Sequence, residues 1–360
     1  MFLRMRLAYR VIRRVFGRWI SPLFAGMGLT FLRLMVWFAR GVDRIVSGKL
    51  RRTQLRAPVI IVGNPRTGTT FLQRFLVDGG VGCGQELWRM LYASLTLQFF
   101  VRPFLPILEK ISPARHHSTV AHKTSLSSVE TDDVSFLFRY FDGFFLYGFF
   151  LAFDEEERVD LFDPKLRDTT SRDFQWLEGS WTRSMVAHRS DRIVAKLFSL
   201  SPRLPPFLER FADAKVLYMV RDPLSVLPSA MSLVTGVLDK KFGFWTLDAD
   251  LRARYLERLY LALVDLMRRF HDDWESGAID RSRVFLVRYD RMMADFDGLM
   301  SELLTFIEHD PDDAFQAQIS AQAEKQRAYK SAHTYDLAKF GLTEERIRKD
   351  CAFLYDGLLA

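Results

Sequence analysis

The stretch VIIVGNPRTGTTFL runs from Val59 to Leu72. Its first four residues are apolar and rich in β-branched side chains, which predicts a short buried strand. Gly63-Asn64-Pro65 breaks the strand, and a helix is expected to begin at Thr69. Such a turn directs free backbone N–H groups and the positive end of the helix dipole at one point. The stretch therefore predicts a binding site for a phosphate or sulfate.

The loop fits the Walker A pattern of nucleotide-binding proteins except at its lysine. Gly63 and Gly68 have the required separation, and Thr70 stands at the Ser/Thr position. Thr69 occupies the lysine position, however, and the cation is Arg66 inside the loop. Ordinary ATP or GTP chemistry would lose its contact to the β- and γ-phosphates here. The alternative is a tight strand-to-helix turn that binds no ligand.

The sequence PRTGTT resembles the 5′-phosphosulfate loop of the sulfotransferases, whose usual form is P-R-S-G-T-T. The resemblance covers residue 56 to the end of the chain, and it is closest to a bacterial branch that also looks like the tyrosylprotein sulfotransferases. It implies transfer of a sulfuryl group from 3′-phosphoadenosine 5′-phosphosulfate (PAPS), with no metal ion. The donor-binding loop residues that it implies are Pro65, Arg66, Thr67, Gly68, Thr69 and Thr70.

A second stretch, VLYMVRDPLSVLPS, runs from Val216 to Ser229. Arg221 follows a predicted strand, and ligands of open α/β sheets bind at such strand ends. In sulfotransferases an arginine and a serine at this separation hold the 3′-phosphate of the donor. Arginine offers fixed, bidentate donors to a phosphate, and the hydroxyl of Ser229 adds another. The alternative is a surface turn at Arg221-Asp222 in which Ser229 has no role.

Three further segments agree with the family. Lys196 ends a predicted strand, like the family's lysine near the donor, although the following residues depart from the usual Lys-Ser-Pro. The FLVRYD segment resembles the recurrent R-Y-E/D motif, and residues 329–342 resemble the C-terminal K-S-x-H-x-Y-x-L-x-x-F-G-L of bacterial members. The resemblance thus implies that Lys196, like Arg66, is a candidate catalytic cation. It also implies that Tyr289 and Lys330 belong to the donor site.

A base must take the proton of the acceptor. Residues 83–86, Cys-Gly-Gln-Glu, resemble the Cys-Gly-Glu-Glu of the tyrosylprotein enzymes, whose second glutamate is the base, so Glu86 is the first candidate. The alternative for Glu86 is a carboxylate that stabilises a first helical turn. His122 is the second candidate because its ordinary pKa suits proton transfer. The alternative for His122 is a histidine in a solvated loop without a catalytic role. Asp132 and Asp133 come third and are expected to be exposed helix residues.

Strands that alternate with helices predict an α/β protein of three layers around a central parallel sheet, with N-terminal helices added. Strands are expected at 192–198, 215–220 and 284–288, and a long helix at 251–274. The expected division is a basic helical segment, 1–55, and a sulfotransferase domain, 56–360. Residues 41–57 are expected to form a polar connection. The aromatic run 129–153 predicts either core or the apolar wall of a substrate cleft.

The charge of the chain is concentrated at its N-terminus. Residues 1–56 contain 13 of the 51 Lys and Arg but only one of the 44 acids, so their net charge is +12 and that of the remainder is −5. This distribution argues against a nucleic-acid-binding body. The two cysteines, Cys83 and Cys351, argue against a disulfide framework and a structural zinc site, and they fit a reducing compartment.

Residues 2–20 have the spacing of an amphipathic helix, and residues 23–38 form a second apolar stretch. Because that stretch contains Arg33 and two glycines, a helix that lies on a membrane is favoured over one that crosses it. A transit peptide and a helical pair packed on the main domain are the alternatives. We expect a cytoplasmic protein bound peripherally to the inner membrane face through these helices, with an amphipathic, lipid-like acceptor.

The leading interpretation is a sulfotransferase that modifies a hydroxyl or amine of an apolar or membrane-associated acceptor. Two other functions compete with it. A P-loop kinase or NTPase is disfavoured by Thr69 in the lysine position and by the lack of a clear Walker B acid. A non-catalytic, membrane-associated nucleotide-binding protein is disfavoured because Arg66, Arg221 and Ser229 are all present.

Overall fold

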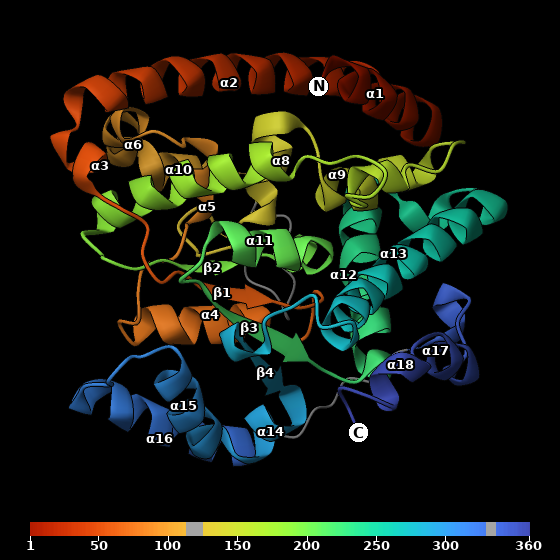
Figure 1. The fold of residues 1–360 in the computed structure, drawn as a ribbon. Helices are drawn as coiled ribbons and strands as arrows, with labels where there is room; N and C mark the ends of the chain where they lie inside the picture. The colour runs from red at the N-terminus through yellow and green to blue at the C-terminus, as the bar shows by residue number, and fades with distance from the viewer. Residues whose placement is uncertain (113–124, 329–335) are drawn as a thin grey trace. The chain divides into compact units, whose positions relative to one another are not determined.

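The computed structural model describes residues 1–112, 125–328 and 336–360 (Figure 1). The chain forms two compact units: residues 1–56 with 82–195, and residues 57–81 with 196–360. The N-terminal helices therefore share a unit with residues 82–195. The predicted α/β class with a central parallel sheet is confirmed.

The sheet has four strands in the order β2-β1-β3-β4. Their bounds are β1 Val59–Val62, β2 Val194–Lys196, β3 Lys215–Val220 and β4 Val284–Arg288. β3 pairs in parallel with both β1 and β4, so that Val62 lies opposite Tyr218 and Val220 opposite Arg288. The direction of the strand order reverses between β1 and β3, which is where open α/β sheets bind their ligands.

The strands form where apolar, largely β-branched runs are buried on both faces. All four residues of β1 are buried, as are those of β3 after Lys215. The predicted strands 215–220 and 284–288 are confirmed at both ends. The strand expected at 192–198 is shorter, because a 3-10 helix, η5, begins at Phe198.

Helices of the second unit surround β1, β3 and β4 (Figure 1). Their bounds are α4 Thr69–Asp78, η5 Phe198–Arg203, α11 Leu204–Arg210, α12 Pro223–Phe242, η6 Phe244–Thr246, α13 Ala249–Glu275, η7 Arg281–Arg283, α14 Tyr289–Ala294, α15 Phe296–Phe306, α16 Asp313–Ala328, η8 Ala338–Phe340, α17 Glu344–Asp350 and α18 Ala352–Tyr355. Phe270 of α13 stacks on Tyr218 of β3, and Phe75 of α4 contacts Phe296 and Phe315. The first contact holds α13 on the sheet, and the other two hold α4 against α15 and α16.

In the described residues of the first unit, helices are the main regular structure. Its helices are α1 Phe2–Phe16, α2 Ser21–Val46, α3 Gly48–Arg52, α5 Leu87–Leu91, α6 Leu95–Val101, η1 Arg102–Phe104, α7 Leu105–Ile111, α8 Asp133–Tyr140, α9 Phe144–Phe149, η3 Leu151–Phe153, η4 Val159–Leu161 and α10 Thr170–His188. The polar connection expected at 41–57 is wrong, since α2 continues to Val46 and α3 follows it. Asp43 explains the difference: it is buried in an ion pair with Arg183 and is not a linker residue.

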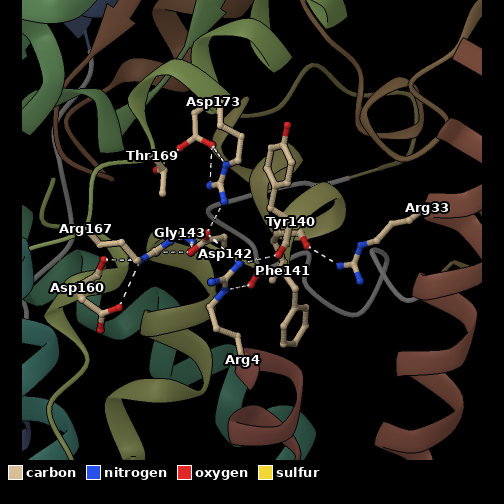
Figure 2. A network of polar contacts seen from close by, with 12 residues as sticks. Arg4, Arg33, Tyr140, Phe141, Asp142, Gly143, Asp160, Arg167, Thr169 and Asp173 are labelled. Atoms are coloured by element: carbon tan, nitrogen blue, oxygen red, sulfur yellow. Dashed lines mark hydrogen bonds and ion pairs between the residues drawn. The ribbon is translucent and has the colours of Figure 1, made fainter. Parts of the chain in front are cut away.

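Buried polar contacts attach the N-terminal helices to the rest of their unit. Asp43 of α2 accepts from Arg183 at 2.7 Å and from the backbone N–H groups of Leu95 and Thr96 at the start of α6. At α1, Arg4 donates to the carbonyl of Phe141 at 2.8 Å and pairs with the buried carboxylate of Asp142 (Figure 2). These contacts agree with one alternative for this segment, a helical pair that packs on the main domain.

The aromatic run 129–153 supplies core to the first unit. Phe136, Phe144 and Phe153 are buried, and Tyr147 contacts Phe162 edge to face. These four rings fit the core alternative, whereas Phe145 and Phe149 of the same run are only half-buried.

Candidate functional site

A predicted site residue lies at the carboxyl end of each strand of the sheet. Lys196 ends β2, the loop from Gly63 to Thr70 follows β1, Arg221 follows β3 and Tyr289 follows β4. Because parallel strands end at the same edge of a sheet, residues far apart in sequence meet there. The side-chain contacts of the second unit show which of them meet.

The loop after β1 requires backbone conformations that glycine provides. Gly63 has a φ of 139°, and a Cβ there would lie 2.8 Å from the carbonyl oxygen of Met219. Gly68, with a φ of 100°, is the N-cap of α4 and supplies no side-chain cap to its first turn. The first N–H groups of α4 are thus oriented toward the loop interior, where they favour an anion.

Arg66 has a positive φ of 78° although it is not glycine. A left-handed backbone at a non-glycine residue costs energy and persists only where neighbours stabilise it. Two contacts do so: Nη1 of Arg221 donates to the carbonyl oxygen of Arg66 at 2.9 Å, and Nε of Arg66 donates to Oγ of Ser229 at 3.0 Å. The predicted phosphosulfate loop and the predicted 3′-phosphate residues are therefore in direct contact.

Tyr289 lies beside the same loop. Its ring is stacked under the guanidinium of Arg221, with Cζ 3.8 Å from the ring centroid. A Cβ at Gly68 would lie 3.3 Å from the Tyr289 ring. The ring thus orients Arg221 by a cation–π contact and fills the space next to Gly68.

Lys196 contacts the loop from the β2 side. It is buried, and its Nζ donates to Oγ1 of Thr70 at 2.8 Å. Thr67 is also buried, and its hydroxyl donates to the carbonyl of Asn64 within the loop. Three cationic side chains therefore lie in this loop or contact it: Arg66, Arg221 and Lys196. Together they create a site for an anion with more than one charged group.

Glu86 belongs to the first unit, where it is largely buried between two basic side chains. Its Oε2 lies 2.7 Å from Nε of Arg89 and 3.1 Å from Nε2 of His188. Burial alone would raise the pKa of this carboxyl group, but the hydrogen bond to His188 and the charge of Arg89 outweigh it and leave the pKa below its usual value. Glu86 is therefore an ionised carboxylate that is held by two basic neighbours.

Backbone pairing holds the segment that carries Glu86. The N–H of Cys83 donates to the carbonyl of Arg192, and the N–H of Val194 donates back to Cys83. Burial raises the pKa of the Cys83 thiol to about 12, which makes this cysteine a packing residue. Gln85, at the first glutamate position of the related motif, donates to Oγ of Ser184 at 3.0 Å.

Sequence reasoning missed His188. It lies at the end of α10 and is separated from Glu86 by 102 residues, and no local pattern connects the two. An expected position is also wrong: Asp132 and Asp133 are buried, not exposed. Asp132 accepts from the indole N–H of Trp181, so its carboxylate is occupied within the core.

Two predicted site residues, His122 and Lys330, lie outside the described residues. Within the described ranges, no group of three His, Cys, Asp or Glu side chains is arranged to hold a metal ion.

Known proteins share this architecture. The crystal structure of the sulfotransferase STF1 from Mycobacterium tuberculosis H37Rv superposes with a TM-score of 0.72 at 16% identity, over 97% of this chain and 90% of STF1. That of STF9 from Mycobacterium avium gives a TM-score of 0.61 at 16% identity, over 88% of this chain and 81% of STF9. No curated protein matches the sequence of this chain. The model of a sulfotransferase family matches residues 58–313.

That match covers well over half of the chain, including the loop after β1 and the strand ends that carry Arg221 and Tyr289. The chain belongs to the sulfotransferase family and is a sulfotransferase enzyme.

Proposed function

We propose that the enzyme takes its sulfuryl group from PAPS and transfers it to a hydroxyl or amine of an apolar, membrane-associated acceptor. The observation that carries the donor assignment is the contact of Arg66 with Ser229, together with that of Arg221 with Arg66. PAPS carries anionic groups at its 5′ and 3′ positions, and these contacts bring two arginines and a serine hydroxyl into one site. Such a site suits a donor with two anionic groups better than an isolated phosphate.

The chemistry follows from these residues. The acceptor oxygen or nitrogen attacks sulfur, and the bond from sulfur to the bridging oxygen breaks, so the nucleotide leaves as 3′,5′-adenosine diphosphate (PAP). Negative charge grows on the bridging oxygen, where Arg66, Lys196 and the first N–H groups of α4 stabilise it. The proton of the acceptor goes to a base, and the Cys-Gly-Gln-Glu motif assigns that role to Glu86.

The acceptor class rests on the apolar surface of the N-terminal segment. We propose that the enzyme works at the inner face of the membrane and takes an amphipathic acceptor there. Exposed aromatic residues of α2, among them Phe24, Phe31 and Phe38, support this location. Nucleic acid is not a proposed partner, because the excess positive charge belongs to the first 56 residues alone.

The test incubates the full chain with ³⁵S-labelled PAPS and a bacterial lipid extract, and follows label into the organic phase. We expect transfer of label that PAP inhibits. Arg66→Ala should abolish this transfer, and Arg254→Ala, a control substitution of an exposed arginine, should retain it. Chelators are expected to have no effect. Transfer of ³²P from ATP that is lost with chelator and restored by Mg²⁺ would instead indicate the kinase. PAP binding without transfer to any acceptor would indicate a non-catalytic protein.

A further inference from the structure

The outer face of α2 is apolar and exposed along most of its length. Phe24, Met27, Phe31, Leu34 and Phe38 recur at three- and four-residue spacing, and 59–69% of each side chain is exposed. This spacing places them in one stripe along the helix. An unbroken stripe of large exposed apolar side chains is a typical docking surface.

The opposite face of α2 packs on its own unit and contains charged residues. Arg33 is buried and donates to the carbonyl oxygens of Phe138 and Leu137, at 2.6 and 3.1 Å. Asp43, near the end of the helix, is buried against Arg183. The helix therefore has one face committed to the protein and one face available to a partner.

A second apolar stripe lies on α6, η1 and α7. Phe100, Phe104, Ile107 and Ile111 are exposed and recur at the same spacing, and Phe99 adjoins them. α6 packs on α2, and its first N–H groups donate to Asp43. We call the two stripes together the apolar surface.

The exposed charges on the segments that carry this surface have one sign. Exposed basic side chains on its elements and the neighbouring turns include Arg18, Arg44, Lys49, Arg52, Arg102 and Lys110. Residues 1–56 and 95–111 are all described, and they expose no acidic side chain: Asp43 is buried, and Glu109 is partly buried and accepts from the N–H of Leu126. An apolar face with a basic rim is complementary to an anionic lipid bilayer.

We infer that the apolar surface docks the enzyme flat on an anionic membrane, with α2 lying in the plane of the bilayer and α6–α7 as a second contact. The inference rests on the proposed membrane partner and names the surface that meets it. α2 is long and apolar enough to cross a membrane. If α2 crossed the membrane, Arg33 and Asp43 would lose their buried partners. The buried charge of Arg183 would then be left unpaired, which is strongly destabilising. A second copy of the chain fits less well, because two basic rims repel each other.

The experiment measures co-sedimentation of the full chain with phosphatidylglycerol–phosphatidylcholine vesicles and with phosphatidylcholine alone, at low and high salt, with no turnover involved. We expect strong binding to anionic vesicles that salt weakens. The paired variant Phe31→Glu/Phe38→Glu should reduce the partition coefficient at least about tenfold, and Phe104→Glu/Ile107→Glu should also reduce it. The matched control is Leu166→Glu/Leu261→Glu, which changes two exposed apolar residues elsewhere and should bind like the parent.

A second measurement does not depend on these variants. Bromine-labelled lipids should quench tryptophan emission through Trp37, which is 68% exposed on α2. Trp37→Phe should reduce that quenching to the part contributed by Trp19, which is also exposed. Stripe variants that bind like the parent, or absence of quenching, would overturn the inference. A dimer in solution that the stripe variants dissociate, without vesicle binding, would assign the apolar surface to a second copy. Because none of these readouts involves sulfuryl transfer, they separate this inference from the proposed reaction.

Discussion

Nε of Arg66 donates to the hydroxyl oxygen of Ser229 at 3.0 Å, across 163 residues of sequence. One of these residues stands in the loop after β1 and the other on α12, so the contact joins the two stretches that the sequence singles out separately. Arg221 completes the arrangement by donating to the backbone of Arg66 and stacking on Tyr289. The residues of the proposed donor site thus form one connected set of side chains.

Replacing Arg221 by alanine is expected to weaken PAP binding more than about tenfold, since a charge-assisted hydrogen bond is worth roughly 1.5–3 kcal/mol. The loss should exceed that of a single phosphate contact, because Arg221 also stabilises the left-handed backbone of Arg66. Isothermal titration calorimetry measures the affinity, and Arg254→Ala on α13 is the control. An Arg221→Ala affinity equal to that of the parent would contradict the site assignment.

Gly68→Ala tests the loop conformation. The φ of 100° disfavours any side chain, and the added Cβ would lie 3.0 Å from Cε of Met292. We expect PAP affinity to fall by about tenfold or more, because strain of roughly 1–3 kcal/mol must be relieved by moving the loop. Gly236→Ala on α12 is the matched control, since a Cβ there meets nothing within 4 Å and the φ of Gly236 is not positive. Affinity unchanged in Gly68→Ala would mean that the loop does not cradle the anion.

Glu86→Gln should reduce turnover about 10²–10⁴-fold while PAP binding is kept, because a general base contributes that range. The pH dependence has a defined sign. The carboxylate must be unprotonated, and its pKa lies below the usual value, so activity should persist down to an unusually low pH. Hydrogen bonding to His188 lowers this pKa, so His188→Ala should move the acid limb of kcat/KM to higher pH.

The control for these variants is Glu178→Gln, a partly exposed carboxylate on the same helix as His188, which should leave the pH profile unchanged. Loss of turnover in His122→Ala with full turnover in Glu86→Gln would transfer the role of base to His122. Loss of turnover in His188→Ala at every pH, with Glu86→Gln active, would make His188 itself the base.

Asp43→Asn tests the anchoring of the N-terminal helices. Breaking a buried ion pair costs about 3–5 kcal/mol, because the remaining charge of Arg183 stays buried. The midpoint of urea unfolding, followed by the emission of Trp176 and Trp181, should fall accordingly. Glu155→Gln, which breaks an exposed ion pair with Arg14, should change stability by less than about 1 kcal/mol.

The same pair predicts a pH dependence of stability. Burial would raise the pKa of Asp43, but the hydrogen bonds from Arg183 and Thr96 outweigh it and the pKa lies below its ordinary value. A carboxyl group with a lowered pKa stabilises the fold above its unfolded pKa, and this contribution is lost as the pH falls toward the folded pKa. Asp43→Asn should therefore unfold with a weaker dependence on acid pH than the parent.

Local patterns in the sequence determined the strands and the anion loop. β1, β3 and β4 are apolar runs ended by Gly63, Arg221 and Tyr289, and each run carries the information for its own extended backbone. Asp222 is the N-cap of α12 and its side chain accepts from the N–H of Leu224, and Pro223 suits the first turn. These signals act within a few residues, so the order of elements along the chain follows from them.

Where α2 ends, and what it contacts, followed from no local pattern. The polar residues after position 40 look like a linker in the sequence, yet Asp43 is buried because Arg183 and the start of α6 supply its partners. A buried aspartate and an exposed one have the same local sequence signature. Only the partner, 140 residues away, decides between them.

The sequence by itself determined the loop after β1, the strand ends and the residue types of the proposed donor site, because those features depend on neighbours in the chain. Only the tertiary structure decided that Ser229 accepts from Arg66, that His188 contacts Glu86 and that α2 exposes one apolar face while burying Arg33. These outcomes depend on strand register and helix packing, which bring together side chains more than 100 residues apart.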